Sequence, residues 1–355
     1  MSGTCRACGV PRLLTMTQVW RDGCIVDTTS GSASLCIYEA SYPTALIEDL
    51  EGRLGIPLDR IVYLAGTHAA VKVLGVLYES HPLIGKILFS APLHRVTERT
   101  LIRFGKAIGV ANVAIVERRR RNGARVIIEN PFDLSNCLAV ISGILQIADR
   151  HSIAYDILEE NGSYLVDFKP APSDTCEEEA YKRLFAENLA PQKADTAIKL
   201  VKCKICGAPR EVGELCEFDM DNGLIRDTVS GERMIMMGVH GYNTIIRELS
   251  WELGQSVYDI FIDFEKRSLA GKLSGASEDE LLWDEKELRN YFALRGFGML
   301  KELREKDGAT FFKVHNAFIA PLVAGRLLAL WELRNGREGS YEFDVKDDTL
   351  YFSIS

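Results

Sequence analysis

The chain has no long hydrophobic run of the kind that crosses a membrane. Its longest apolar stretch, AFIAPLVAGRLLALW at 317–331, contains Pro321 and Arg326 and is shorter than the ~20 residues that a membrane helix needs. A secretory signal is also missing, because Cys5 and Cys8 lie where its basic and apolar regions would begin. These absences predict a cytoplasmic protein without a membrane span.

Basic residues are not in excess, and the short motifs of common enzyme classes are absent. The 355 residues carry a formal net charge of -8, whereas nucleic-acid-binding domains are usually basic. No HExxH, GxSxG, GxGxxG or P-loop sequence occurs, and the six histidines show no paired spacing. We therefore expect no DNA-binding module, and the sequence favours a binding protein over an enzyme.

Cysteine is the residue type with the most informative arrangement. Nine cysteines are present, an odd number, and four of them form two CxxC pairs, in CRACGVP at 5–11 and CKICGAP at 203–209. In a long chain of this kind the pattern favours metal or redox chemistry over a framework of disulfides. A glycine follows each pair and permits the tight turn of a cysteine knuckle.

The two cysteine pairs mark an internal duplication. Each is followed by a DTxSG motif, and then by a Tyr-containing helical pattern that ends in Leu-Gly. Further along, each half has a hairpin signal, Asn122-Gly123 or Asp307-Gly308, and an apolar helix behind it. The sequence thus divides into a first half, a linker and a second half, at 1–168, 169–200 and 201–355.

Helical patterns and antiparallel hairpins alternate in each half, which predicts an α+β fold. After the knuckle and its hairpin, apolar spacing predicts a helix at 42–55 and then strands at 60–66 and 259–264. The last helix of each half is apolar on nearly all sides and precedes a closing strand pair. Such a helix is covered on most faces, by a sheet and by a second helix, the other half or a ligand.

The knuckles are candidate metal sites. A structural zinc site takes four ligands, and each half supplies only two cysteines that recur in the other half. Separate sites completed by Cys24 or Cys36 and by Cys216 are one alternative, and a redox dithiol is another. A structural zinc ion is the expected cofactor, with iron as the alternative metal. The economical interpretation is one shared site on a pseudo-two-fold axis, made by Cys5, Cys8, Cys203 and Cys206.

The later part of each half resembles the 4-vinyl reductase domain family, also described as hydrocarbon-binding domains. In the first half the resemblance rests on Phe104-Gly105, Asn130-Pro131-Phe132, Cys137, Gly143, Glu159-Glu160 and Phe168. In the second half it rests on Phe297-Gly298, Asn316-Ala317-Phe318, Gly325, Asp347-Asp348 and Phe352. The resemblance implies a tandem pseudo-dimer whose fold is shared with haem/nitric-oxide sensor domains, with an apolar cavity between helices and sheet.

The implied cavity provides the candidate ligand-binding residues. In the first half these are Phe104, Phe132, Leu138, Ile141, Leu145 and Tyr155. In the second half they are Phe297, Phe318, Leu322, Leu327 and Trp331. The structural alternative is that these side chains only fill two cores.

The expected function is the binding of a small hydrophobic molecule, for sensing, carriage or delivery. One alternative is an enzyme of anaerobic or cofactor metabolism that acts on such a molecule in the same pocket. Another is a scaffold or assembly subunit of a larger complex. The sequence leaves a homodimer or a protein partner open.

Two further motifs have simple structural interpretations. The Asp and Ser of DTxSG, at 27–31 and 227–231, are typical of turns in which a side chain binds its own nearby backbone. The basic run Arg118 to Arg121 is typical of a solvated hairpin with salt links. A contact with phosphate or an acidic partner is its alternative.

Overall fold

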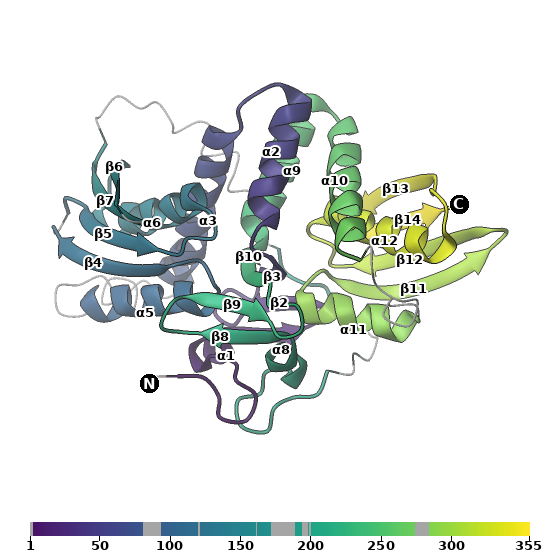
Figure 1. The fold of residues 1–355 in the computed structure, drawn as a ribbon, viewed down its shortest axis with the longest axis horizontal. Coiled ribbons are helices and arrows are strands. Elements are labelled where there is room, and N and C mark those ends of the chain that lie inside the picture. Colours follow the sequence, from purple (N-terminus) through teal and green to yellow (C-terminus); the bar gives the residue numbers. More distant parts are fainter. Residues whose placement is uncertain are drawn as a thin grey trace.

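The computed structural model describes residues 3–80, 94–119, 121–160, 162–171, 189–193, 198, 200–273 and 284–355, so most of the expected linker lies outside the described residues. Both halves have the same order of elements (Figure 1). The first half contains α1 (Arg12–Thr17), β1 (Gln18–Arg21), β2 (Cys24–Asp27), β3 (Ala33–Glu39), α2 (Tyr42–Leu54), α3 (Asp59–Ser80), α5 (His94–Ala107), β4 (Asn112–Arg118), β5 (Ala124–Glu129), α6 (Leu134–Asp149), β6 (Ile153–Glu160) and β7 (Ser163–Pro170). The second contains α8 (Arg210–Leu215), β8 (Cys216–Asp219), β9 (Leu224–Asp227), β10 (Arg233–Gly238), α9 (Val239–Leu253), α10 (Ser256–Leu273), α11 (Glu285–Arg295), β11 (Met299–Lys306), β12 (Ala309–His315), α12 (Ala320–Asn335), β13 (Tyr341–Lys346) and β14 (Thr349–Ile354).

The α+β class is confirmed, but two segments predicted as strands are helices. Residues 60–66 belong to α3 and residues 259–264 belong to α10. Leu58, Val62 and Ala65 are buried at helical spacing, and Val257, Phe261 and Phe264 repeat that spacing in the second half. A short apolar run does not by itself distinguish a strand from the buried face of a helix, so this prediction was wrong.

A six-stranded sheet joins the two halves, in the order β1-β2-β3-β10-β9-β8. The central pair β3 and β10 is antiparallel, and Ile37 lies opposite Met236. The DTxSG motifs form the turns before β3 and β10. The Asp27 carboxylate accepts hydrogen bonds from the amides of Thr29 and Ser30, and Asp227 makes the matching bonds. These motifs therefore shape the shared sheet, as their turn interpretation predicted.

A four-stranded antiparallel sheet and its helices lie on each side of the shared sheet (Figure 1). The first has the order β4-β5-β7-β6 and packs on α6, and the second has the order β11-β12-β14-β13 and packs on α12. In each half a long helix packs along the apolar one, α3 on α6 and α10 on α12. Glycine permits this close approach, because a Cβ at Gly143 or Gly325 would lie 2.5 Å from a backbone oxygen of the neighbouring helix.

We call each four-stranded sheet with its helices an outer unit. The β1-β2 hairpin of the first half packs against the outer unit of the second half, and the β8-β9 hairpin of the second half packs against that of the first. The Gly298 amide donates to the carbonyl of Gly23, the turn glycine between β1 and β2, at 3.0 Å. In the reverse direction, the amide of Met236 in β10 donates to Ile108 after α5, at 2.9 Å. A Cβ at Gly223, the turn glycine between β8 and β9, would lie 2.5 Å from the carbonyl oxygen before β4. Each outer unit is thus completed by the hairpin of the opposite half.

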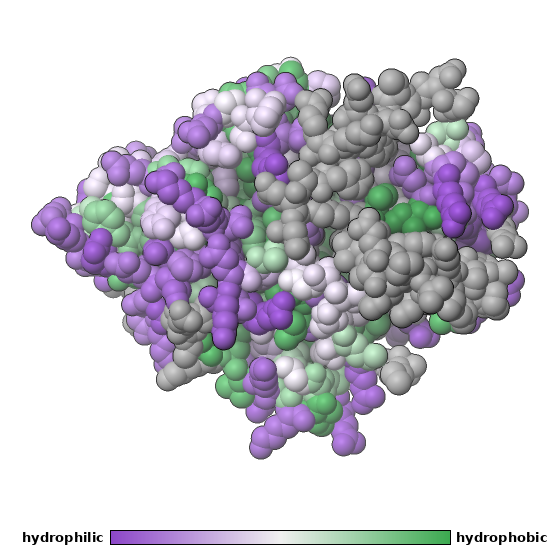
Figure 2. Space-filling view, turned by 180° about the vertical axis from the view of Figure 1, so that it is seen from behind, coloured by the Kyte–Doolittle hydropathy of each residue, from purple (hydrophilic) through white to green (hydrophobic). Residues whose placement is uncertain are grey.

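The longest apolar stretch of the sequence is a buried helix. All residues from Ala320 to Trp331 in α12 are buried. Seen from behind, the surface over the second half, on the left of Figure 2, is dominated by hydrophilic side chains. Among the described residues, no helix is both long enough and apolar enough to cross a membrane.

The two hairpin turns predicted from Asn-Gly and Asp-Gly differ. Asp307 and Gly308 both have positive φ, 52° and 80°, as a type I′ turn requires. In the first half the positive φ values belong to Arg121 and Gly123, at 60° and 88°, and not to Asn122. The carboxylate of Asp149, the last residue of α6, accepts hydrogen bonds from the amides of both Arg121 and Gly123. It thereby holds a loop that is longer than the two-residue turn of the second half.

Candidate functional site

The two cysteine knuckles have the same backbone geometry. The amide of Cys5 donates to Val10 and the amide of Gly9 donates to Cys5, both at 2.8 Å. The amides of Cys203 and Gly207 make the matching bonds at 2.8 and 2.9 Å. Gly9 and Gly207 have φ of 74° and 80°, a left-handed conformation that favours glycine. The knuckles are therefore equivalent in structure as well as in sequence.

The fold brings both knuckles to one place. The Sγ atoms of Cys5 and Cys203 are 3.8 Å apart, and those of Cys8 and Cys206 are 3.4 Å apart. All four lie within 4.8 Å of one another. Four thiolates at about 2.3 Å from one metal ion would stand about 3.8 Å apart along the edges of a tetrahedron. The four cysteines, which we call the cysteine clasp, therefore fit a single metal ion.

Backbone amides favour the ligating form of two of these thiols. The N–H of Ile205 is the main cause that lowers the pKa of Cys203 to about 6, and the N–H of Ala7 lowers the pKa of Cys5. A thiolate, not a thiol, binds metal, so these amides prepare the clasp for a cation. Burial has the opposite effect on Cys8 and raises its pKa to about 12.

The other described cysteines lie apart from the clasp. Cys24 and Cys36 are buried, and their thiols lie within hydrogen-bonding distance of the carbonyls of Asn316 and Met237. Cys216 is buried in the apolar cluster beneath the shared sheet. Within the described part of the chain, the clasp is the single group of three or more candidate metal ligands. The separate sites weighed from the sequence are therefore not assembled there.

An apolar pocket of about 100 Å³ lies in the first half, between α5, α6 and the strands β4 and β5. Two of the six predicted residues of this half, Ile141 and Leu145, line it. Phe132 and Tyr155 pack against the core beside the pocket, and Leu138 belongs to that core. Phe104 lies elsewhere, in the cluster beneath the shared sheet.

The second half has almost no space at its predicted pocket. All five predicted residues lie in one core cluster and are between 0% and 6% exposed. Leu327 and Trp331 border a space of only about 20 Å³. In this half the side chains fill a core, which was the structural alternative. The five residues are Phe297, Phe318, Leu322, Leu327 and Trp331.

The two spaces occupy equivalent positions. Gly223, the turn glycine of the β8-β9 hairpin, lies against Ala111 just before β4. Gly23, the turn glycine of the β1-β2 hairpin, lies against Gly298 just before β11. Phe297 therefore corresponds to Val110, and not to Phe104 as the two Phe-Gly pairs suggested. Val110 lines the pocket of the first half, whereas Phe297 is buried in the core of the second.

Large side chains close the second space. Two pairs of residues align the rest of the two halves. Gly109 after α5 corresponds to Gly296 after α11, and Asn130 before α6 corresponds to Asn316 before α12. Four small or aliphatic residues of the first pocket have aromatic counterparts. Phe292, Phe297, Phe312 and Trp331 stand where the first half has Gly105, Val110, Val126 and Leu145.

A charge cluster is buried beside the filled space. Arg326 donates to Glu265, and another of its nitrogens lies 3.5 Å from Glu39 of the first half. Its guanidinium stacks over the rings of Tyr38 and Phe297, 4.5 and 4.8 Å from their centroids. Arg326 and Glu265 are 2% and 0% exposed, so this cluster ties the two halves together inside the core.

The buried pair of Glu265 and Arg326 has no counterpart at the equivalent positions of the first half, and it was not anticipated. Gly66 and Val140 occupy the positions that correspond to Glu265 and Arg326. A signal was present, because Arg326 is the one charged residue within 317–331. A charge in an otherwise buried helix requires a partner, and that requirement would have pointed to an acidic residue nearby.

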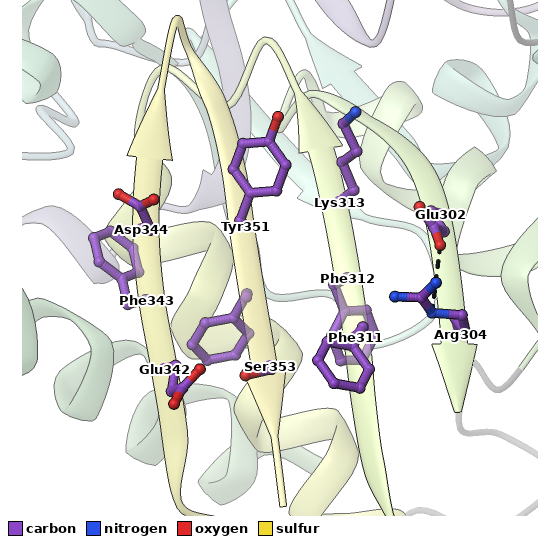
Figure 3. A pocket seen from close by; sticks show the side chains of 11 residues that line it. Glu302, Arg304, Phe311, Phe312, Lys313, Glu342, Phe343, Asp344, Tyr351 and Ser353 are labelled. Atoms are coloured by element: carbon purple, nitrogen blue, oxygen red, sulfur yellow. Dashed lines mark ion pairs between the residues drawn. The ribbon is translucent and has the colours of Figure 1, made fainter. Parts of the chain in front are cut away.

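A third concavity, of about 390 Å³, lies on the outer face of β11-β12-β14-β13 (Figure 3). Two of its basic side chains lie over aromatic rings of the same surface. Lys313 lies over the ring of Tyr351, 5.4 Å from its centroid, and Arg304 lies over Phe311 at 5.3 Å. This concavity has charged and aromatic side chains, in contrast to the mainly aliphatic lining of the first-half pocket.

The basic hairpin of the first half is linked to acidic residues. Arg118 pairs with Glu98 and with Asp149, each at 2.7 Å. Arg119 pairs with Asp167 on the neighbouring strand. These salt links agree with the structural interpretation of the basic run.

Comparison with known family models, with curated proteins and with solved structures finds no match for this chain. A functional assignment therefore rests on the clasp and on the pocket.

Proposed function

We propose that the chain binds a small apolar molecule in the pocket of its first half. The observation that carries this proposal is the contrast between a pocket of about 100 Å³ and an equivalent space that aromatic side chains reduce to about 20 Å³. Protein cores are normally close-packed, so an open space in one half of a duplicated core is informative. Apolar cavities of roughly 150 Å³ hold benzene or xenon, which sets the scale of the ligand.

The second half, on this proposal, is a structural partner. Its hairpin completes the outer unit that contains the pocket, and its own core is closed. The proposal includes the resemblance to a tandem of 4-vinyl reductase-like domains, with one copy that keeps a cavity and one degenerate copy.

We further propose that the cysteine clasp holds one structural zinc ion, through Cys5, Cys8, Cys203 and Cys206. Four thiolates close the coordination shell, so the ion would crosslink the ends of the two halves and leave no position for a substrate. Metal analysis tests the proposal. One zinc ion per chain supports it, whereas iron or two metal ions per chain would overturn it.

Native mass spectrometry of gently purified protein tests the ligand proposal. We expect an additional small apolar mass that is lost in the Leu145→Trp variant, because this substitution copies the residue that closes the second half. The control is Leu158→Trp, since Leu158 is 59% exposed on β6 and lies outside the pocket. If Leu145→Trp retains the ligand as well as the control does, the pocket is not the binding site.

A further inference from the structure

The pocket of the first half combines aliphatic walls with one charged end. Among the described residues that line it, Glu98 and Arg118 are the charged ones. The other described lining residues are aliphatic side chains, glycine and Cys137, without an aromatic ring. These walls offer no ring for stacking, and flexible aliphatic walls suit an alkyl group. A volume of about 100 Å³ corresponds to roughly four or five non-hydrogen atoms.

The charged end carries more negative than positive charge, and one of its acceptor atoms has no partner among the described residues. Arg118 donates through Nε to Glu98 at 2.7 Å, and through its two other nitrogens to Asp149 at 2.7 and 3.1 Å. It also donates to the carbonyl of Gly123 at 2.7 Å. Glu98 has two carboxylate oxygens, and only one of them has a partner among the described residues, namely Arg118. This end therefore presents a carboxylate oxygen that can accept a hydrogen bond, next to two negative charges that share one guanidinium.

We infer that the ligand is a short, branched or linear aliphatic molecule whose hydrogen-bond donor, a hydroxyl or an amine, binds Glu98. This inference rests on the proposed ligand pocket and adds the chemistry of the head group. An alcohol or an ammonium group would donate to the free oxygen of Glu98 while its alkyl part fills the aliphatic space. A carboxylate would add a third negative charge beside Glu98 and Asp149, which share the single positive charge of Arg118.

The second half supplies a matched control for Glu98. Glu285 stands the same number of residues before the glycine that follows its helix, and it pairs with Arg289. The space next to it is closed by aromatic side chains. A substitution of Glu285 therefore removes the equivalent carboxylate without touching the pocket.

The experiment compares three probes with one carbon skeleton: 2-methylpropan-1-ol, 2-methylpropan-1-amine and 2-methylpropanoate. Binding to the full chain is measured by NMR titration, with xenon as a probe that lacks a head group. We expect the alcohol and the amine to bind at least about tenfold more tightly than the carboxylate. Glu98→Met should remove that preference, and Glu285→Met should leave it unchanged.

Glu98→Gln provides a second variant if Glu98→Met does not fold. It keeps an acceptor oxygen but loses the charge, so the amine should lose more affinity than the alcohol. Equal binding of all three probes, tighter binding of the carboxylate, or a preference that persists in the Glu98 variants would overturn the inference. If xenon binds in those cases, the pocket proposal survives alone; if neither xenon nor any probe binds, both fail.

Discussion

The two outer units of this protein have the same fold but different interiors. In the first half, small and aliphatic residues such as Gly105 and Val126 leave a pocket of about 100 Å³. In the second half, Phe292 and Phe312 stand at those positions, and about 20 Å³ remains. The second half also has a buried ion cluster around Arg326 that the first half lacks. A duplicated scaffold can therefore keep its fold while one copy is open and the other is closed.

The exchanged hairpins explain why the closed copy is retained. Each outer unit packs against the hairpin of the opposite half, so the open unit depends on β8, β9 and β10 for its completion. The clasp lies where the two hairpins begin and involves both halves equally. On this account the closed half contributes structure, and the open half contributes the ligand site.

Loss of the clasp is expected to have the largest effect, because it acts on both halves at once. Cys203→Ser should abolish metal binding and lower the free energy of unfolding by roughly 5 kcal/mol or more, since metal binding is coupled to folding. Metal analysis and chemical denaturation measure these changes. The control Cys216→Ser removes a buried thiol outside the clasp and should keep one metal ion per chain. A Cys203→Ser protein with its metal intact would contradict the shared site.

Disruption of the ion cluster should destabilise the closed half by about 3–5 kcal/mol. Arg326→Met leaves Glu265 and Glu39 buried without their cation, which is costly in a low-dielectric core. The double variant Arg326→Met with Glu265→Gln should be less destabilised than the single variant, because one buried charge is removed with its partner. Val140→Met changes the equivalent position of the open half and should cost less than about 1.5 kcal/mol. Equal losses for Arg326→Met and Val140→Met would show that the cluster has no special role.

Opening the closed half should cost about 1–3 kcal/mol and create a second apolar site. Phe312→Val copies the residue of the open half, and the cost comes from lost packing and the new cavity. Thermal denaturation reports the loss of stability, and binding of a second xenon atom reports the cavity. If the core collapses around the smaller side chain, the stability falls without a second site, and residues other than Phe312 must also keep this half closed.

Closing the open half should have the smallest effect on stability. Val126→Phe places a ring into existing space, so we expect the free energy of unfolding to change by less than about 1 kcal/mol while apolar ligands no longer bind. Ile127→Phe is the control, because the next residue on β5 has the opposite orientation in the sheet. A ligand that binds Val126→Phe as tightly as the control variant would exclude this pocket.

The sequence was sufficient to predict the duplication, the α+β class and the residues of the clasp, because each depends on a motif that occurs twice. It was not sufficient to predict α3 and α10, since segments 60–66 and 259–264 are apolar in a way that fits a strand or a buried helix face. The exchange of hairpins was also invisible, because identical motifs in both halves are compatible with packing within or between halves.

The pocket was predicted in part. Ile141 and Leu145 were found because they lie on the apolar face of α6. Val110 and Val126 were missed, since two Phe-Gly pairs suggested an alignment of Phe104 with Phe297 that the hairpin contacts do not support. Whether a core is open or filled depends on the total volume of side chains that four elements bring together. That volume can be compared between the two halves only when their sequences are aligned correctly.

Xenon binding to the full-length chain tests the central claim most directly. In crystals under xenon pressure, we expect one xenon atom per chain, in contact with Val126 and Leu145, and none at Phe312 and Trp331. The Val126→Phe variant should lose that atom. Equal occupancy in both halves, or a vacant first-half pocket under the same pressure, would contradict the account of one open and one closed copy.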